Sequence, residues 1–305
     1  MEKRLTISAM LFSVGFVFML VLAVGAFFFG VQVGSEKIEA KYTAAKAEEE
    51  KGKVDDSATP YQQQDLVSFY LTVFSPYREF QTEWLSAMDK LSRGGNVDAS
   101  SAFKNLSKLA SKKAEEASSF NMQKSPLLGD AQVAYIRSMK LFKSAADKAA
   151  SSKSASHADL FKAVLADSNY KTAVKESLDG QKAYYEAMQK WAATVDINIP
   201  AVAKTPDPLS VAKWNAMPIT VKNLVIADYL AKQDEMNSFY PHDLTSRVDE
   251  FIKSGQASKM KLQTVNGIVE LLIGTKAVDF GDFGPNKEQF YASETLPQLP
   301  FFYSE

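Results

Sequence analysis

The sequence predicts an all-α protein, with an N-terminal transmembrane helix followed by an extracytoplasmic antiparallel helical bundle and a C-terminal region of shorter helices. Three observations support this prediction. Residues 7–34 form one long apolar segment, apolar residues recur at steps of three and four through 61–195, and no strand-like alternation interrupts them. Amphipathic helices joined by short connections must bury their apolar faces against one another, which favours a bundle.

The apolar segment is long enough to cross a bilayer. No charged residue occurs between Leu5 and Ser35, and a helix needs about 20 residues to cross about 30 Å of hydrocarbon. A cleaved signal peptide has a shorter apolar region, about 7–15 residues, followed by a small-residue cleavage site. Here the best such site, Val24-Gly25-Ala26, is followed by three phenylalanines. The sequence therefore favours a retained anchor, with the lipid bilayer as a partner through residues 7–34.

Basic residues set the expected orientation of this anchor. Lys3 and Arg4 precede the segment, whereas the charges that directly follow it roughly cancel. Excess positive charge stays on the cytoplasmic side. We therefore expect a cytoplasmic stub at residues 1–6 and a single-pass protein in the cell membrane, with its bulk outside the cytoplasm. The absence of cysteine fits a bacterial envelope protein.

Residues 35–60 form a charged linker. Its first half is rich in alanine, glutamate and lysine, which are good helix formers, and its second half contains Gly52 and ends at Pro60. Two interpretations remain open: a helical stalk that continues the membrane helix, and a flexible spacer.

The bundle is expected at residues 61–195. The first helix carries an apolar stripe from Leu66 to Leu91, in which Pro76 should kink or split the helix near Phe74. The second begins at Asp98, a plausible N-cap, and the third begins at Ser125-Pro126. The fourth has a short first part and a longer main part that ends near Val195, with a candidate break at Asp179-Gly180.

The C-terminal region, residues 196–305, should contain shorter helices. Apolar spacing and capping residues place them near 209–216, 219–236, 243–254 and 258–275, before an irregular tail from about residue 279. Residues 61–195 carry 18 basic and 14 acidic groups, whereas residues 196–305 carry 10 and 14. These opposite balances favour packing of the C-terminal region on the bundle.

Composition excludes several classes of protein. The formal net charge is −1, so no overall positive field favours nucleic acid as a partner. The absence of cysteine removes disulfides, thiolate metal sites, iron–sulfur clusters and cysteine nucleophiles. No phosphate-binding loop, dinucleotide fingerprint, Gly-x-Ser-x-Gly elbow or calcium loop occurs. We expect no cofactor and no metal.

Three residues are the candidates for catalysis. Glu270 lies in an otherwise apolar run, where partial burial would raise its pKa, although a glutamate on the exposed side of the helix or paired with a lysine is the favoured interpretation. Asp228 lies in a similar run. His242 precedes a predicted helix, where a cap or a loop contact is the plainer interpretation. The repeated Asp-Phe-Gly at 279–281 and 282–284 copies a kinase signature, but the other kinase motifs are missing, which favours a turn.

Aromatic residues are plentiful, with 20 Phe, 12 Tyr and 3 Trp. Some are candidates for a pocket or a partner surface, but most match helical stripes and are expected to be core residues. Residues 301–303 are harder to bury from a tail and could dock onto the bundle or reach a partner. These candidates are Tyr70, Phe74, Tyr77, Tyr184, Trp191, Phe301, Phe302 and Tyr303.

Three hypotheses of function follow. The leading one is a non-enzymatic, membrane-anchored component of the cell envelope that binds a partner protein or scaffolds an assembly. The second is a helical, sensor-like module that binds a small molecule among the aromatic residues. The third is an envelope hydrolase, which requires a cleft with two carboxyl groups about 5–10 Å apart.

Overall fold

Helices account for the regular structure of the part of the chain that can be described. The computed structural model describes residues 60–94, 98–119, 124–153, 156–202 and 206–303. The predicted stub (1–6), the membrane segment (7–34) and the linker, except Pro60, lie outside these residues. Within the described ranges the fold is all-α, as predicted, and the isolated antiparallel bridge between Ser210 and Thr264 is the only β pairing. No helix in these ranges is long and apolar enough to cross a bilayer.

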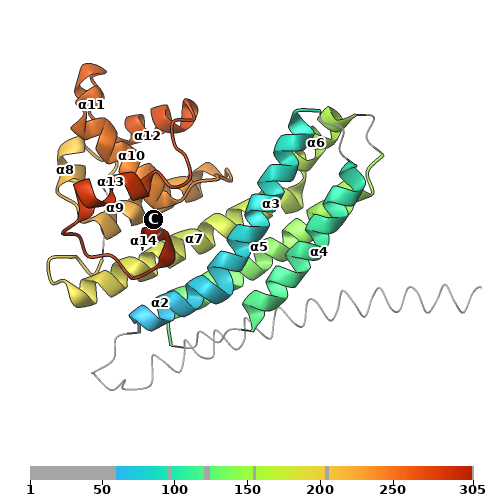
Figure 1. Ribbon diagram of the computed structural model, residues 1–305, viewed down its shortest axis with the longest axis horizontal. Coiled ribbons are helices and arrows are strands. Elements are labelled where there is room, and N and C mark those ends of the chain that lie inside the picture. Colours follow the sequence, from blue (N-terminus) through green and yellow to red (C-terminus); the bar gives the residue numbers. More distant parts are fainter. Residues whose placement is uncertain (1–59, 95–97, 120–123, 154–155, 203–205, 304–305) are drawn as a thin grey trace, which may run out of the picture. The chain divides into compact units, whose positions relative to one another are not determined.

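The bundle is formed by long helices that lie side by side (Figure 1). Helix α3 packs against α4, α4 against α5, and α5 against α7, with α2 leading into α3 and the short α6 preceding α7. The elements are α2 (Gln63–Phe69), η1 (Tyr70–Phe74), α3 (Ser75–Ser92), α4 (Ala99–Ser118), α5 (Pro126–Ala150), α6 (His157–Ala166) and α7 (Ser168–Val195).

The first predicted helix bends through a π-helical turn. Pro76 has no N–H, and in an α-helix its ring would collide with the carbonyl of Thr72. Residues Tyr70–Phe74 instead form a wider turn, in which the Ser75 N–H donates to the Tyr70 carbonyl. The chain stays helical on both sides of the turn, so the expected disturbance near Phe74 is present as a π turn.

Capping residues start the next helices where the sequence indicates. The Asp98 carboxylate accepts from the Ser101 backbone N–H at 3.0 Å, as an N-cap should. Ser125 precedes Pro126, the first residue of α5, but its hydroxyl donates to the Pro60 carbonyl and leaves the helix end uncapped.

The candidate break at Asp179-Gly180 is wrong, because α7 continues through it. Gly180 has a packing role. A Cβ at this position would lie 3.2 Å from the Tyr135 ring and 3.3 Å from the Ala131 carbonyl oxygen. The missing side chain therefore allows α7 to approach α5 closely.

The C-terminal helices pack on the bundle through α7 and α9, and Figure 1 shows them grouped beside one half of α7. They are α8 (Val211–Asn215), α9 (Ile219–Gln233), α10 (Pro241–Lys253), α11 (Gln256–Lys259), α12 (Val265–Gly274), α13 (Phe283–Tyr291) and α14 (Pro300–Tyr303). One continuous hydrophobic core extends from α2 to α14.

Two expectations for this region are wrong. The single helix expected at 258–275 is two helices, α11 and α12, because the chain turns at Lys261, whose φ of 56° is left-handed. The tail from about residue 279 is not wholly irregular, since it contains α13 and α14. Its turns and prolines conceal these helices from a search for long apolar stripes.

Candidate binding groove

An aromatic cluster joins the bundle to the C-terminal helices. It consists of Phe74 from η1, Tyr184 from α7, Tyr240 and His242 at the start of α10, and Phe301 from α14. The Tyr240 and Phe301 rings each lie 4.9 Å from the His242 ring, centroid to centroid, and both stack on it. Phe74 lies 5.1 Å from Tyr184 and 5.7 Å from Tyr240. This junction cluster fixes the two regions relative to each other.

His242 is buried in this cluster and is held neutral. Its Nδ1 is 2.8 Å from the Tyr185 hydroxyl. Burial, helped by the positive charge of Arg78, lowers the pKa of His242 well below its usual value. A buried, neutral ring packed by other rings has a structural role. His242 lies in the first turn of α10 and contacts side chains of other helices, so the expected cap or loop contact is wrong.

The next residue, Asp243, pins the turn that contains the repeated Asp-Phe-Gly. Its carboxylate oxygens accept from the Tyr240 N–H at 2.8 Å and the Phe283 N–H at 3.1 Å. Burial raises the pKa of Asp243 to about 6, against the opposing effect of these backbone hydrogen bonds. The second Asp-Phe-Gly therefore supplies a backbone donor to a buried carboxylate. Asp282 ends the turn and Phe283 and Gly284 begin α13, so the interpretation as a turn is only partly correct.

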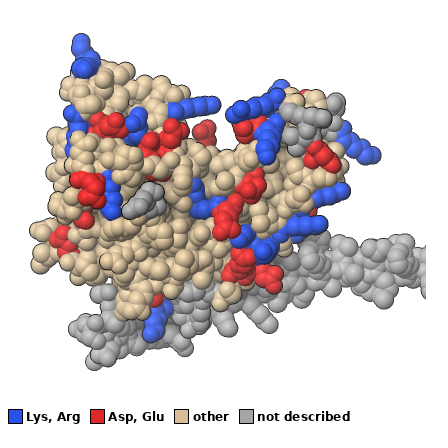
Figure 2. Space-filling view, viewed as in Figure 1, with Lys and Arg blue, Asp and Glu red and all other residues tan. Residues whose placement is uncertain are grey.

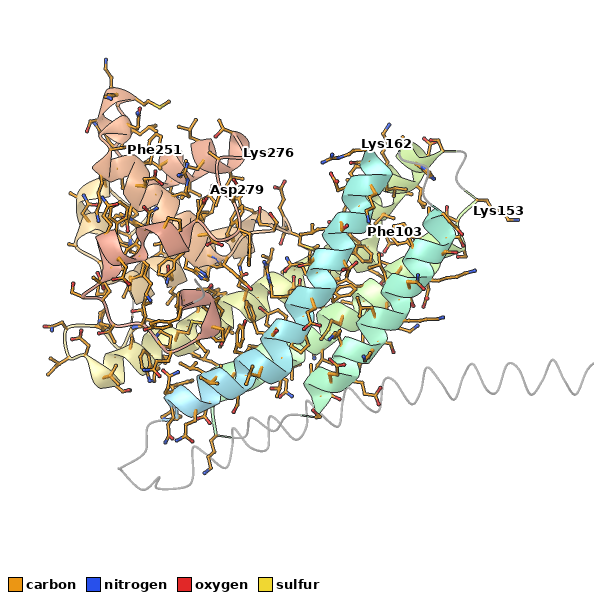
Figure 3. All side chains as sticks on the ribbon, in the orientation of Figure 1. Phe103, Lys153, Lys162, Phe251, Lys276 and Asp279 are labelled. Carbon is orange, nitrogen blue, oxygen red and sulfur yellow. The ribbon has the colours of Figure 1, made fainter. Side chains whose placement is uncertain are left out.

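A groove opens on the surface next to the junction cluster, between α3 and the C-terminal region, and encloses about 430 Å³. Figure 2 shows that the described surface is hollowed between these two regions, and Asp279, labelled in Figure 3, lies on the side that faces α3. We call this the Arg78 groove. It is lined by Ser75, Arg78, Glu79, Gln81, Thr82 and Leu85 of α3, by Ser238 and Tyr240, and by Phe280.

Arg78 is the unusual residue of the groove, because its guanidinium is buried without a carboxylate partner among the residues that the structure describes. Its side chain donates to Gln81 Oε1 and to the Ser238 carbonyl, both at 2.7 Å, and its Cζ lies 4.2 Å from the centre of the Tyr240 ring. Only 9% of Arg78 is exposed. None of the ion pairs between described residues includes it. A guanidinium has five N–H donors, so some remain for a further acceptor.

Two acids near the groove form ion pairs with other residues. The Glu79 carboxylate pairs with Lys113 at 2.6 Å, and Asp282 lies 3.6 Å from Arg247. The opposite wall is apolar and includes Phe280, which is 62% exposed and lies 5.3 Å from the Tyr240 ring. The groove thus combines a fixed positive charge with exposed aromatic surface.

A second buried cation is fully paired. Lys222 Nζ lies 3.0 and 2.9 Å from the two carboxylate oxygens of Asp249. The same carboxylate accepts from Trp214 Nε1 and from the Tyr291 hydroxyl, both at 2.6 Å. These four side chains tie α8, α9, α10 and α13 together. Burial and the Asp249 charge raise the pKa of Tyr291, so the phenol remains a donor.

The three candidates for catalysis are not brought together. Glu270 is exposed on the solvent side of α12, as the favoured interpretation of this residue expects, and is not partly buried. Asp228 pairs with Lys182 at 2.5 Å and Lys232 at 2.7 Å. Partial burial alone would raise the pKa of Asp228, but these two lysines lower it. In the described ranges, no group of three or more histidine or acidic side chains is placed to hold a metal ion.

Most aromatic candidates lie in the core instead of on a surface. Phe74, Tyr77, Tyr184 and Phe302 are at most 3% exposed, and Phe301 is 9% exposed. Phe74, Tyr77 and Tyr184 lie on the apolar stripes of their helices, where packing takes precedence over exposure. Phe301 and Phe302 are buried although they belong to the short α14.

The other aromatic candidates retain accessible surface. Tyr70 and Trp191 are half-buried, on η1 and near the end of α7. Tyr303 is 49% exposed, and Lys287 Nζ lies 3.8 Å from the centre of its ring. None of the three lines the Arg78 groove.

Sequence reasoning missed the groove residues Arg78, Tyr240 and Phe280. One signal was present: Arg78 follows Phe74 by four residues, so it falls on the buried stripe of α3, where a charge is expensive. Nothing comparable marked Lys222 and Asp249, whose pairing depends on helices that are distant in sequence.

Comparison with known proteins gives no relative. No family model matches the chain, and no curated protein or solved structure is significantly similar to it. The groove and its residues therefore carry the functional argument.

Proposed function

We propose that this chain is a non-enzymatic, membrane-anchored protein of the bacterial cell envelope, which presents a rigid helical domain to a partner protein. Residues 7–34 would anchor it in the bilayer, with residues 1–6 in the cytoplasm and the helical domain outside. The anchor is supported by the uncharged stretch from Leu5 to Ser35 and by the basic residues before it.

The Arg78 groove is the feature of the structure that best supports a binding function. Its walls come from α3 and from the segments around Tyr240 and Phe280, which the junction cluster holds in place. Binding to a preformed surface has a smaller entropic cost than binding to a mobile one. An exposed aromatic side chain beside a buried arginine resembles the composition of interface hot spots, where aromatic residues and arginine predominate.

A small-molecule module is the second candidate. A volume of about 430 Å³ lies in the range of small-molecule pockets, roughly 300–1,000 Å³. The interior aromatic residues pack against one another, however, so a ligand would have to bind in the groove and not among them. The exposed position of Glu270 gives the hydrolase hypothesis no comparable support.

Site-specific photocrosslinking in the native membrane tests the binding function. A photoreactive phenylalanine analogue at Phe280 should crosslink to one protein partner in the full-length chain. The same analogue at Met260, which is 51% exposed but does not line the groove, is the matched control. Identical products from both positions, or none from position 280, would contradict the proposal.

The anchor and its orientation have separate tests. The full-length protein should stay in the membrane pellet after alkaline carbonate extraction. Because the chain has no cysteine, Ser254→Cys, at an exposed position, provides a unique label. A membrane-impermeant maleimide should label it in cells with an intact cytoplasmic membrane. Extraction into the supernatant, or labelling only after lysis, would show that the anchor or its orientation is wrong.

A further inference from the structure

We infer that the Arg78 groove receives a segment of a partner protein in which a carboxylate lies beside an apolar side chain. This inference rests on the proposed binding function and adds the chemistry of the partner. It follows from four properties of the groove: a charge without a counter-ion, a fixed guanidinium plane, an apolar wall and an open shape.

The buried positive charge of Arg78 would be stabilised by an anionic ligand. Arginine stays protonated in proteins, so burial cannot neutralise it. Its described partners, the Gln81 amide oxygen and the Ser238 carbonyl, are neutral. A buried charge that has only neutral partners is costly, and a carboxylate that reaches the groove would offset that cost.

The guanidinium is already held in one orientation. Gln81 is itself fixed, since its Nε2 donates to the Asn237 carbonyl at 3.1 Å, and the Tyr240 ring supports the guanidinium at 4.2 Å. Arginine and carboxylate groups match each other as two parallel hydrogen bonds when both are suitably placed. Little side-chain entropy remains to be lost when such an anion binds.

The apolar wall indicates what accompanies the carboxylate. Phe280 and Leu85 flank the groove, and Phe280 is 62% exposed although it contacts Tyr240. An aliphatic or aromatic side chain next to the acid would cover this surface. The groove lies open along α3, which suits a peptide segment better than an enclosed small molecule.

Glu79 argues against a more highly charged ligand. Its exposed carboxylate lines the same groove and is only partly offset by Lys113 at 2.6 Å. A phosphate with two negative charges meets stronger repulsion from Glu79 than a single carboxylate does. The combination of Arg78 and Glu79 therefore favours one negative charge.

Thr82 provides a test that does not remove Arg78. Thr82 is exposed, lines the groove and lies one helical turn after Arg78. The variant Thr82→Glu would place a carboxylate within reach of the Arg78 guanidinium. This carboxylate would compete with the carboxylate of a ligand for Arg78. Thr82→Gln has nearly the same size without the charge. Arg93→Gln, at an exposed arginine that pairs with Asp89 at 2.9 Å, controls for the loss of a surface charge.

The probes are two capped tripeptides, Leu-Phe-Glu and its Leu-Phe-Gln counterpart, tested by saturation-transfer NMR on the full-length protein in lipid nanodiscs. Empty nanodiscs correct for partition into lipid. The wild type and Arg93→Gln should bind the glutamate peptide at least about tenfold more tightly than the glutamine peptide. Thr82→Gln, which fills the same space as Thr82→Glu without the charge, should keep more of this preference than Thr82→Glu does. Thr82→Glu should lose this preference.

Equal binding of the two peptides by the wild type, or binding of neither, would overturn the inference, as would a preference retained by Thr82→Glu. If crosslinking from position 280 still captures a partner in that case, the binding function stands and only its carboxylate chemistry is wrong. If crosslinking fails as well, both proposals fall.

Discussion

The two buried cations of this domain, Lys222 and Arg78, differ in how their charge is compensated. Lys222 lies against both oxygens of Asp249, which also accept from Trp214 and Tyr291. Arg78 has an amide oxygen, a backbone carbonyl and an aromatic ring as its partners. Lys222 is neutralised by Asp249 and therefore has a structural role. Arg78 lines a groove and has no counter-ion among the described residues, so it is able to bind an anionic ligand.

Removal of Asp249 should have the largest effect on stability. Asp249→Ala leaves the Lys222 ammonium buried without its counter-ion, so we expect a loss of about 3–5 kcal/mol in the free energy of unfolding. Urea unfolding followed by tryptophan fluorescence measures it, since all three tryptophans, Trp84, Trp191 and Trp214, lie in the helical domain. A loss below about 1 kcal/mol would show that Asp249 is not needed to compensate the buried charge of Lys222.

The double variant Lys222→Met with Asp249→Leu tests whether the unpaired charge of Lys222 causes the loss of stability in Asp249→Ala. Both charges disappear together, and apolar side chains of similar size fill the site, so the double variant should be more stable than Asp249→Ala. Trp214 and Tyr291 still lose their acceptor, which leaves the double variant below the wild type. A double variant that is less stable than Asp249→Ala would show that the charge on Lys222 is not the source of the cost.

Asp243, another buried acidic residue, should give a pH dependence. Its pKa is raised to about 6 from an unfolded value near 3.9, so the native state holds the proton more tightly. Its contribution to stability is complete below about pH 4 and is lost as the pH rises through 6, by up to about 3 kcal/mol.

Comparison with Asp243→Asn isolates this effect. The difference in unfolding free energy between the wild type and the variant should shrink from pH 4 to pH 7. His242, whose pKa is lowered by burial, acts in the opposite sense in both proteins: it costs stability as the pH falls below about 6.5. A pH-independent difference would contradict the raised pKa of Asp243.

Removal of Arg78 should cost less than removal of Asp249. Arg78→Met takes the donors from Gln81 and Ser238, but it also removes a charge that has no counter-ion, so we expect a loss of about 1–2 kcal/mol. Urea unfolding under the same conditions provides the comparison. A loss as large as that of Asp249→Ala would identify Arg78 as mainly a structural clamp.

The smallest effect should come from Thr82→Glu. A new pair with Arg78 at a spacing of four residues should stabilise the domain by up to about 0.5 kcal/mol relative to Thr82→Gln. Thermal unfolding of the two variants in low salt measures this difference, and added salt should reduce it. A Thr82→Glu variant that is less stable than Thr82→Gln would show that the Arg78 guanidinium does not pair with a carboxylate at position 82.

The sequence predicts the helices well where local chemistry decides them. Asp98 caps α4 and Pro126 opens α5 because these effects need only neighbouring residues. Gly180 could not be interpreted correctly, since its role depends on Tyr135 in another helix, and a glycine next to an aspartate also suits a turn.

The candidate groove depends on contacts between residues that are far apart in sequence. Ser238, which accepts from Arg78, lies 160 residues later in the chain. Phe280 belongs to a segment whose composition predicts an irregular tail, and most aromatic residues of the stripes were expected to be core residues, which gave no indication of a groove. Periodicity identifies the buried face of a helix, but it does not identify which buried charge lacks a partner.

The central claim is that the Arg78 groove binds a partner through a carboxylate, and crosslinking from position 280 in two backgrounds tests it most directly. The crosslink to the partner should form in the Thr82→Gln protein and be strongly reduced in the Thr82→Glu protein. The two variant proteins should be present in the membrane in equal amounts. Equal yields of the same crosslink in the two backgrounds would contradict the account.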